Sequence, residues 1–274
     1  MATFQLLTYK EGTMMRNCLI IAGALVVFTA STSYAQHDWY VGGSLSYLKQ
    51  SDSDNTGTTG NFTTGNGSPV IPFGTPISAG TPYGWETEFE SGWAISGEVG
   101  LLYASGLRSG IELTYSTADV DKHKGVNVAG TVIDGVDAAV LTGSRNQLGA
   151  TVGQVVADGQ GSISSTGVFL NLYYDFVDLG SFYPYLGAGI GLMSVDVEYK
   201  PSGVKIIDQS ETKIGFQLKA GLTWRTTENI DLYGEYVFRM TDDVEVDNAL
   251  FPGTLDIENK QHLVSVGIRY RFTY

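Results

Sequence analysis

The 274-residue sequence contains one cysteine, Cys18, and only 16% of its residues are charged. One cysteine cannot form an internal disulfide, so a disulfide-stapled scaffold is excluded. The low charge content and the 35 glycines argue against a helical bundle or a coiled coil. With a formal net charge of −13, the chain also lacks the basic surface with which nucleic-acid-binding proteins neutralise phosphates.

Long apolar runs are scarce, and the clearest one lies near the N-terminus. Residues 18–28 (CLIIAGALVVF) follow Arg16 and fall short of the roughly 20 residues needed to span a bilayer as a helix. Ser33 and Ala35 supply the small residues that a signal peptidase recognises. We therefore expect an N-terminal extension and secretory signal peptide over residues 1–35, cleavage before Gln36, and a mature domain over residues 36–274.

Apolar residues in the mature chain recur at every second position, which is typical of β-strands with one apolar face and one polar face. In the last segment, Val264, Val266 and Ile268 alternate with Ser265, Gly267 and Arg269. Eight segments follow this pattern, at about residues 39–47, 93–103, 107–115, 168–176, 186–192, 214–225, 230–240 and 264–274.

The links between these segments are alternately short and long. Short links lie near residues 104–106, 178–181 and 226–229, and long links near 50–92, 118–163, 194–213 and 241–261. Aromatic residues gather near both ends of the segments. Sorted links and two aromatic belts are typical of outer membrane barrels. The sequence thus predicts an all-β fold, an antiparallel up-and-down transmembrane β-barrel with short periplasmic turns and long extracellular loops.

The strand number and the loops leave alternatives open. Eight strands are expected, but residues 131–133 (TVI) and 139–141 (AVL) would give ten strands if they crossed the membrane, or else extend a hairpin above it. Gly, Ser, Thr and Asn dominate residues 51–68, which predicts a mobile stretch.

Several charged residues fall on the polar faces of the strands, and these faces point into the lumen. An eight-stranded barrel is just wide enough for its own side chains, and charges inside it must pair. We expect a lumen cluster that forms either a salt-bridged plug or a narrow, gated ion path; its members are Glu98, Glu112, Lys219, Glu235 and Arg269.

Three stretches carry a family resemblance. Residues 264–274 (VSVGIRYRFTY) resemble the C-terminal signal read by the outer membrane barrel-assembly machinery, carried by Val266, Ile268, Tyr270, Phe272 and Tyr274. Residues 171–176 (NLYYDF) and 183–191 (YPYLGAGIG) resemble strand motifs of the opacity-type and outer-membrane-protein-A-like eight-stranded barrels. The resemblance implies the cell outer membrane of a Gram-negative bacterium, where such proteins act as adhesins, surface antigens or proteins loosely named porins.

Enzymatic and cofactor chemistry find little support. Barrel hydrolases need histidine in a fixed geometry with Ser or Asp, and the three histidines lie at the mature N-terminus (His37), in a long link (His123) and at an outward strand position (His262). Residues 52–57 mimic the start of a calcium loop, but position twelve is Thr63 instead of Glu. We expect no enzyme, no metal site and no cofactor.

The charge distribution directs the functional hypothesis to the loops, because 20 of the 29 Asp and Glu residues lie in the four long links. An acidic surface repels polyanions such as nucleic acid and permits cationic partners or lipopolysaccharide bridged by divalent cations. The leading hypothesis is a monomeric, structural or adhesin-like surface protein or surface antigen that meets a host or cell-surface partner through acidic extracellular loops. The alternative is a small cation-preferring, porin-like channel.

Overall fold

A computed structural model describes residues 37–176, 180–203 and 205–272 of the chain. The expected signal peptide and the cleavage before Gln36 lie outside the described residues, as does Tyr274. Within the described residues, no helix has the length and apolar character needed to cross a membrane.

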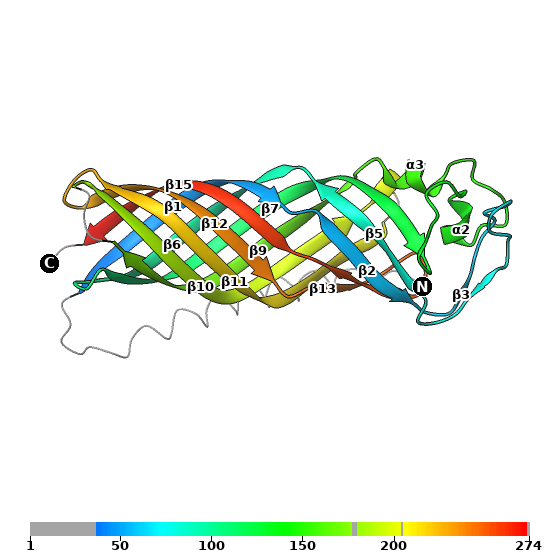
Figure 1. Cartoon of the computed structure of the whole chain (residues 1–274), viewed down its shortest axis with the longest axis horizontal. Helices are drawn as coiled ribbons and strands as arrows, with labels where there is room; N and C mark the ends of the chain where they lie inside the picture. Colours follow the sequence, from blue (N-terminus) through cyan, green and yellow to red (C-terminus); the bar gives the residue numbers. More distant parts are fainter. Residues whose placement is uncertain (1–36, 177–179, 204, 273–274) are drawn as a thin grey trace, which may run out of the picture. The chain divides into compact units, whose positions relative to one another are not determined.

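Eight long antiparallel strands form a closed ring (Figure 1). In ring order they are β1 (His37–Gln50), β6 (Ser91–Tyr103), β7 (Leu107–Val128), β9 (Gly161–Asp175), β10 (Phe182–Tyr199), β11 (Ile207–Arg225), β12 (Ile230–Thr241) and β15 (Lys260–Phe272). The ring closes because β7 pairs with β9 and β1 pairs with β15. The predicted up-and-down barrel is therefore confirmed.

The two segments that would have given ten strands, residues 131–133 and 139–141, do not cross the membrane. Residues 131–132 form β8 (Thr131–Val132), which pairs with the distal end of β7. Residues 139–142 form the short helix α2 (Ala139–Thr142), and a second short helix, α3 (Val152–Val156), follows. The described part of the barrel has eight strands in its ring, and these segments belong to the distal end, where Figure 1 shows α2 and α3.

One band of the outer wall is apolar, as a lipid-facing surface must be. Leu45, Leu218 and Val266 expose 59%, 61% and 67% of their surface, an exposure that only a hydrocarbon environment makes favourable. Aromatic side chains flank the band, with Trp39 and Trp224 toward the short turns and Tyr47 and Trp93 toward the distal end. These rings occupy the two interfaces where amphipathic aromatics are favoured.

Beyond the aromatic residues at the distal end of the lipid-facing band, the apolar residues of the strands change from the outer face to the inner face. On β10, Leu192 points outward and is 47% exposed, whereas the next residue, Met193, points inward and is fully buried. From there on, apolar Val195 and Val197 face the interior while Asp196 faces outward. The same exchange occurs on β7, where outward Tyr115 is followed by outward Asp119. Apolar side chains face lipid in the membrane and avoid water above it, so the exchange marks the membrane surface.

The part of the fold beyond this exchange, which we call the extracellular extension, is a folded structure with its own apolar core. It consists of the distal ends of the long strands, the two helices and added strands. These are β2 (Ser53–Thr59), β5 (Pro82–Phe89), β13 (Val244–Asp247), β14 (Gly253–Ile257), the small pair β3 (Phe62–Thr63) and β4 (Pro76–Ile77), and the 3₁₀ turn Pro201–Gly203.

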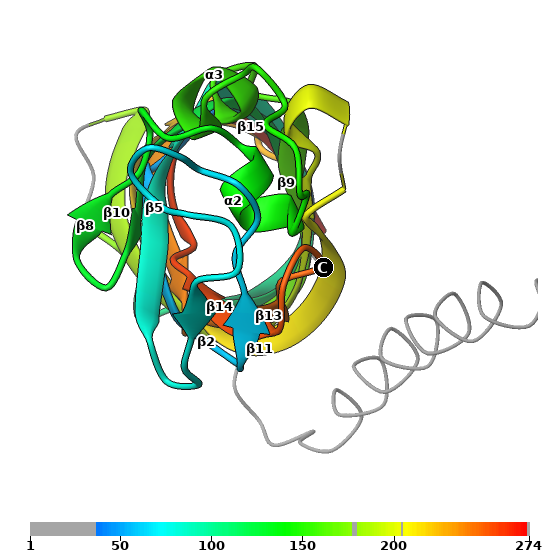
Figure 2. The same ribbon diagram turned by 90° about the vertical axis from the view of Figure 1, so that its right-hand side faces the viewer.

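The strands of the extension pair in the order β13, β14, β2, β5, β7 and continue the barrel wall outward. In the end-on view of Figure 2, α2 lies across the mouth of the ring. The expectation that residues 51–68 are mobile is wrong for β2, which pairs with β5 on one side and β14 on the other. Its Gly and Thr residues lie in a hydrogen-bonded sheet. The backbone pairing on both sides orders this strand, although its small side chains bury little apolar surface.

This change of face predicts that substitutions of the neighbouring residues Val195 and Asp196 differ in their effect on the free energy of unfolding. Val195→Ala should destabilise the extension by about 2 kcal/mol, because it removes two buried methyl groups and leaves a cavity. Asp196→Ala, on the outer face, should change the free energy of unfolding by about 0.5 kcal/mol or less. Hydrogen exchange of the extension amides in detergent measures both, and equal effects would contradict the assignment of faces.

Candidate functional site

The five charged residues predicted to face the lumen all line one interior cavity. They come from five strands: Glu98 from β6, Glu112 from β7, Lys219 from β11, Glu235 from β12 and Arg269 from β15. The cavity between them measures about 10 Å³, which is the lower limit for holding one water molecule. Side chains therefore fill the lumen at this level.

Glu112 is the centre of the cluster and is 1% exposed. Its Oε2 lies 2.5 Å from the Lys219 Nζ, and its Oε1 lies 3.2 Å from the Arg239 Nη2. The side-chain amides of Asn171 and Gln217 also donate to Oε2, at 2.8 and 3.3 Å. Four donors from three other strands converge on one buried carboxylate, which compensates its loss of hydration.

Lys219 links Glu112 to a second carboxylate. Its Nζ lies 3.4 Å from the Glu235 Oε1, and the Tyr185 hydroxyl donates to the Glu235 Oε2 at 2.9 Å. Asn171 extends the network in the other direction, because its amide donates to the Glu98 Oε2 at 2.8 Å as well as to Glu112. The three carboxylates thus belong to one connected network.

Glu98 is held by tyrosines and an arginine. The Tyr40 hydroxyl donates to its Oε1 at 2.6 Å, and the Tyr173 hydroxyl donates to its Oε2. The Arg108 Nη1 lies 3.7 Å away, and the guanidinium stacks 3.9 Å from the Tyr173 ring centre and 4.9 Å from that of Tyr185. Cation–π contacts of this kind hold a buried arginine in place.

Arg269 lines the cavity, but its ion pair is with a residue outside the predicted cluster. Its Nη1 lies 3.8 Å from the Asp231 carboxylate, and its guanidinium stacks on Tyr233 and Tyr40, 4.9 and 5.3 Å from the ring centres. Arg225 and Arg271 contact the same carboxylate at 3.7 and 3.1 Å. The ion pair of Arg269 therefore lies outside the network centred on Glu112, and Arg269 contacts that network through the Tyr40 ring.

The network is close to electrically neutral. Glu98, Glu112 and Glu235 are matched in number by Arg108, Lys219 and Arg239, although Arg108 also contacts the Asp175 carboxylate at 3.3 Å. Arg108, Arg239 and the buried tyrosines Tyr40 and Tyr185 are not among the residues predicted to face the lumen. All four alternate along their strands with lipid-facing neighbours, so this alternation was the signal that could have found them. A neutral, filled network is what a plug requires.

The structure corrects the position of one histidine. His123 lies on β7 inside the extension, buried to 4% exposure, and not in a loop. Its Nδ1 lies 2.8 Å from the Thr87 Oγ1, and its ring packs edge-on against Tyr199 and Trp85. Burial lowers the pKa of His123 to about 4, and the Asp158 carboxylate opposes this shift only partly.

His262 lies at the barrel top on the opposite face of the wall, where its Nδ1 is 2.6 Å from the Tyr236 hydroxyl. His123 and His262 are thus on opposite faces of the wall. Among the described residues, no group of three or more His, Cys, Asp or Glu side chains could hold a metal ion.

Four of the five residues of the expected assembly signal lie within the described chain. Val266, Ile268, Tyr270 and Phe272 all point outward from β15, the strand that pairs with β1 at the ring closure.

Comparison with known proteins gives one family match. A family model described as surface antigen matches residues 79–270. No relative was found among curated proteins.

Solved structures of other proteins are similar to this chain. The outer membrane protein OprG from Pseudomonas aeruginosa is 12% identical, with a TM-score of 0.52 over 88% of this chain and 99% of that one. Neisserial surface protein A is 15% identical, with a TM-score of 0.44 over 86% of this chain and 99% of that one. The likeness to OprG agrees with the antiparallel β-barrel fold predicted from the sequence.

Proposed function

Because this chain belongs to the surface antigen family and folds as an outer membrane β-barrel, we propose that it acts as a non-enzymatic, adhesin-like surface protein through its extracellular extension. The observation that carries the proposal is the contrast between the two halves of the fold. The lumen is filled by a neutral network, whereas the extension has an apolar core that holds a defined surface in place. A preorganised surface binds partners without the entropic cost of ordering loops.

The distal tip of the extension, residues 60–80 and 138–151, is chemically distinct from its acidic walls. The sequence from Asn55 to Trp85 contains no charged residue, and Arg145 is the one charge in residues 138–151. The Gln147 amide donates to the Ser68 carbonyl at 2.5 Å, which joins the two segments. The Arg145 guanidinium stacks on the Phe73 ring, 5.2 Å from its centre. We propose that the partner contact lies at this tip, whose one charged side chain is Arg145, and that the acidic walls exclude polyanions.

Adhesion tests the tip directly. Cells that display the chain should adhere to epithelial cells or matrix glycoproteins above vector controls. The double variant Phe73→Ala/Leu148→Ser should lower specific adhesion at least tenfold, because exposed aromatic and apolar anchors dominate interface energy. Glu245→Gln, on an exposed position of β13, serves as the matched control and should leave adhesion unchanged. Adhesion that does not depend on display would contradict the proposal.

The assignment to the outer membrane also predicts how the protein is exported and inserted. We propose that residues 1–35 direct export, so that N-terminal sequencing of the protein isolated from outer membranes should begin at Gln36. The outward row on β15 would then be read by the barrel-assembly machinery, and the barrel would insert as a monomer among outer membrane lipid and lipopolysaccharide.

The channel alternative has a direct test in planar bilayers. We expect no conductance from the folded protein, because a cavity of about 10 Å³ leaves no aqueous path through the network. Glu112→Gln and Lys219→Met are measured beside it, and heat-modifiable gel mobility shows that each barrel is folded. Reproducible cation-selective openings that these variants alter would support the channel and contradict the plug.

A further inference from the structure

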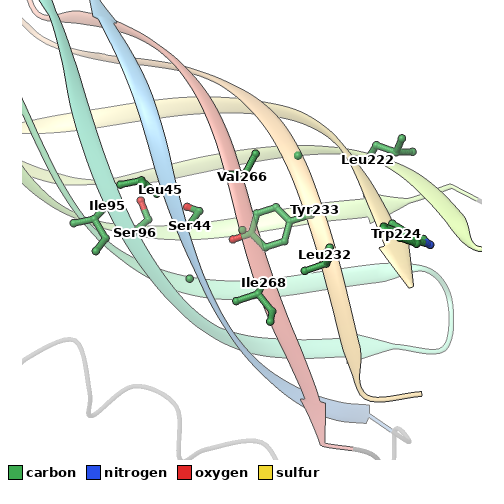
Figure 3. A pocket seen from close by; sticks show the side chains of 13 residues that line it. Ser44, Leu45, Ile95, Ser96, Leu222, Trp224, Leu232, Tyr233, Val266 and Ile268 are labelled. Carbon is green, nitrogen blue, oxygen red and sulfur yellow. The ribbon is translucent and has the colours of Figure 1, made fainter. Parts of the chain in front are cut away.

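The lipid-facing wall and the distal tip both expose large apolar side chains, but only those of the wall lie in lipid. Figure 3 shows part of the wall, where Leu45, Ile95 and Ile268 surround a hollow. The tip lies beyond the membrane surface, so its apolar side chains meet water. They are Val70, Phe73 and Leu148, which expose 65%, 46% and 55% of their surface. Apolar groups gathered at this exposure in water indicate a contact surface.

Backbone contacts hold the two segments of the tip in place. The Gly65 amide donates to the Val140 carbonyl at 3.2 Å. A Cβ at Gly65 would collide with the Ala139 carbonyl oxygen, so the close approach of the two segments requires glycine here. The Leu148 amide donates to the Asp137 carboxylate at 2.9 Å. The exposed apolar side chains are therefore carried by an ordered backbone.

Arg145 is the one cationic side chain of the tip, and its guanidinium has no hydrogen bond or ion pair among the described residues. The guanidinium stacks instead on the Phe73 ring, 5.2 Å from its centre. The other described arginines all contact a carboxylate; they are Arg108, Arg225, Arg239, Arg269 and Arg271. Arg145 thus offers a free fork of N–H donors, which matches the geometry of a carboxylate.

The walls around the tip have the opposite charge. Asp121, Asp208 and Glu245 are exposed on strands of the extension. Because complementary potentials favour association, a fitting partner carries one anionic group at its centre and cationic groups around it.

We propose that the tip binds a protein segment in which a carboxylate lies beside an apolar side chain and basic residues flank both. This inference rests on the proposed adhesive function and names the chemistry of its partner. Arg145 pairs with the carboxylate, and Phe73 and Leu148 contact the apolar side chain, in keeping with the dominance of arginine and aromatic anchors in interfaces. The basic flanks face the acidic walls.

Two other occupants fit the tip less well. An acidic glycan offers hydroxyl groups, whereas Val70 and Leu148 form no hydrogen bonds through their side chains and Arg145 covers one face of Phe73. A second copy of the chain would set Arg145 against Arg145 and acidic wall against acidic wall, which like-charge repulsion disfavours.

Biolayer interferometry with the full protein in nanodiscs tests the proposal. The immobilised probe is the peptide Lys-Lys-Leu-Glu-Phe-Lys-Lys with blocked ends, and the matched probe has Gln in place of Glu. We expect the Glu peptide to bind about tenfold more tightly, because a charge-assisted pair replaces a neutral hydrogen bond. Non-specific attraction to the acidic walls predicts the reverse order, since the Gln peptide is more cationic.

Variants assign the preference to one side chain. Arg145→Met should abolish it, and Arg145→Glu should shift it to a peptide with Lys at the centre. Lys205→Met removes a cation that is 56% exposed outside the tip and should retain the preference for Glu. Heat-modifiable mobility shows that each variant is folded.

Equal binding of the Glu and Gln peptides, or a preference that survives Arg145→Met, overturns the proposal. Stronger binding of immobilised sialyllactose than of the Glu peptide would assign the tip to acidic glycans and overturn it as well. Adhesion of displaying cells is measured separately. Adhesion that depends on Phe73 and Leu148 but not on Arg145 supports the proposed function and contradicts this inference, whereas peptide recognition without adhesion does the reverse.

Discussion

Glu112→Leu is expected to destabilise the barrel by about 3–5 kcal/mol, the usual cost of removing one partner of a buried ion pair. The Glu112 carboxylate contacts the Lys219 ammonium at 2.5 Å and the Arg239 guanidinium at 3.2 Å, and both cations are buried. Without it, two positive charges remain in a lumen that has no room for water to solvate them. Urea-dependent unfolding in lipid vesicles, followed by gel mobility, measures the loss.

Two further variants separate charge from packing. The double variant Glu112→Leu/Lys219→Met removes opposite charges together and should recover part of the lost stability, leaving Arg239 as the unpaired cation. Glu245→Gln, at an exposed position on β13, removes a carboxylate charge from the surface and should change stability by about 0.5 kcal/mol or less. If Glu112→Leu unfolds at the same urea concentration as the wild type, the network does not support the fold.

The barrel itself was predictable because its information is local. Strand parity alone decides which side chains face lipid, so the eight segments and the inward positions of Glu98, Glu112 and Lys219 follow from alternation. The ion-pair partners of these charged residues could not be predicted from the sequence. Which of the inward Arg108 and Arg239 meets which carboxylate depends on strand stagger and side-chain reach, and a single sequence does not contain the stagger.

The extension escaped prediction because its outward residues are acidic. Segments such as residues 194–199 were assigned to loops, although they alternate as regularly as the membrane strands. The available signal was a pair of consecutive apolar residues at the point where the apolar face changes sides. Leu192-Met193 on β10 and Tyr47-Leu48 on β1 are such pairs, each with one exposed and one buried member. The long-range pairing of β2 with β5 and β14 had no comparable signal.

The extension should lose stability as the pH falls from about 6.5 to about 4, because His123 must remain neutral in its core. Desolvation lowers the pKa of the folded-state imidazole to about 4, whereas the unfolded chain has the ordinary value near 6.5. Between these values the unfolded state binds more protons, so stability is full above about pH 6.5 and declines as the pH falls toward 4. The difference of about 2.5 pKa units corresponds to about 3 kcal/mol.

Hydrogen exchange of the extension amides at pH 7.5, 5.5 and 4.5 measures this loss, compared with His123→Gln. Glutamine keeps a hydrogen-bonding group beside the Thr87 hydroxyl but does not titrate. The groups that face His123 from the surrounding strands are Thr87, Trp85 and Tyr199, with Asp158 as the nearby carboxylate, and all are retained in the variant. The difference between wild type and variant should therefore isolate the imidazole. His262→Gln, on the outer face of the barrel top, should follow the wild-type pH profile, and parallel profiles for wild type and His123→Gln would show that His123 is not the titrating group.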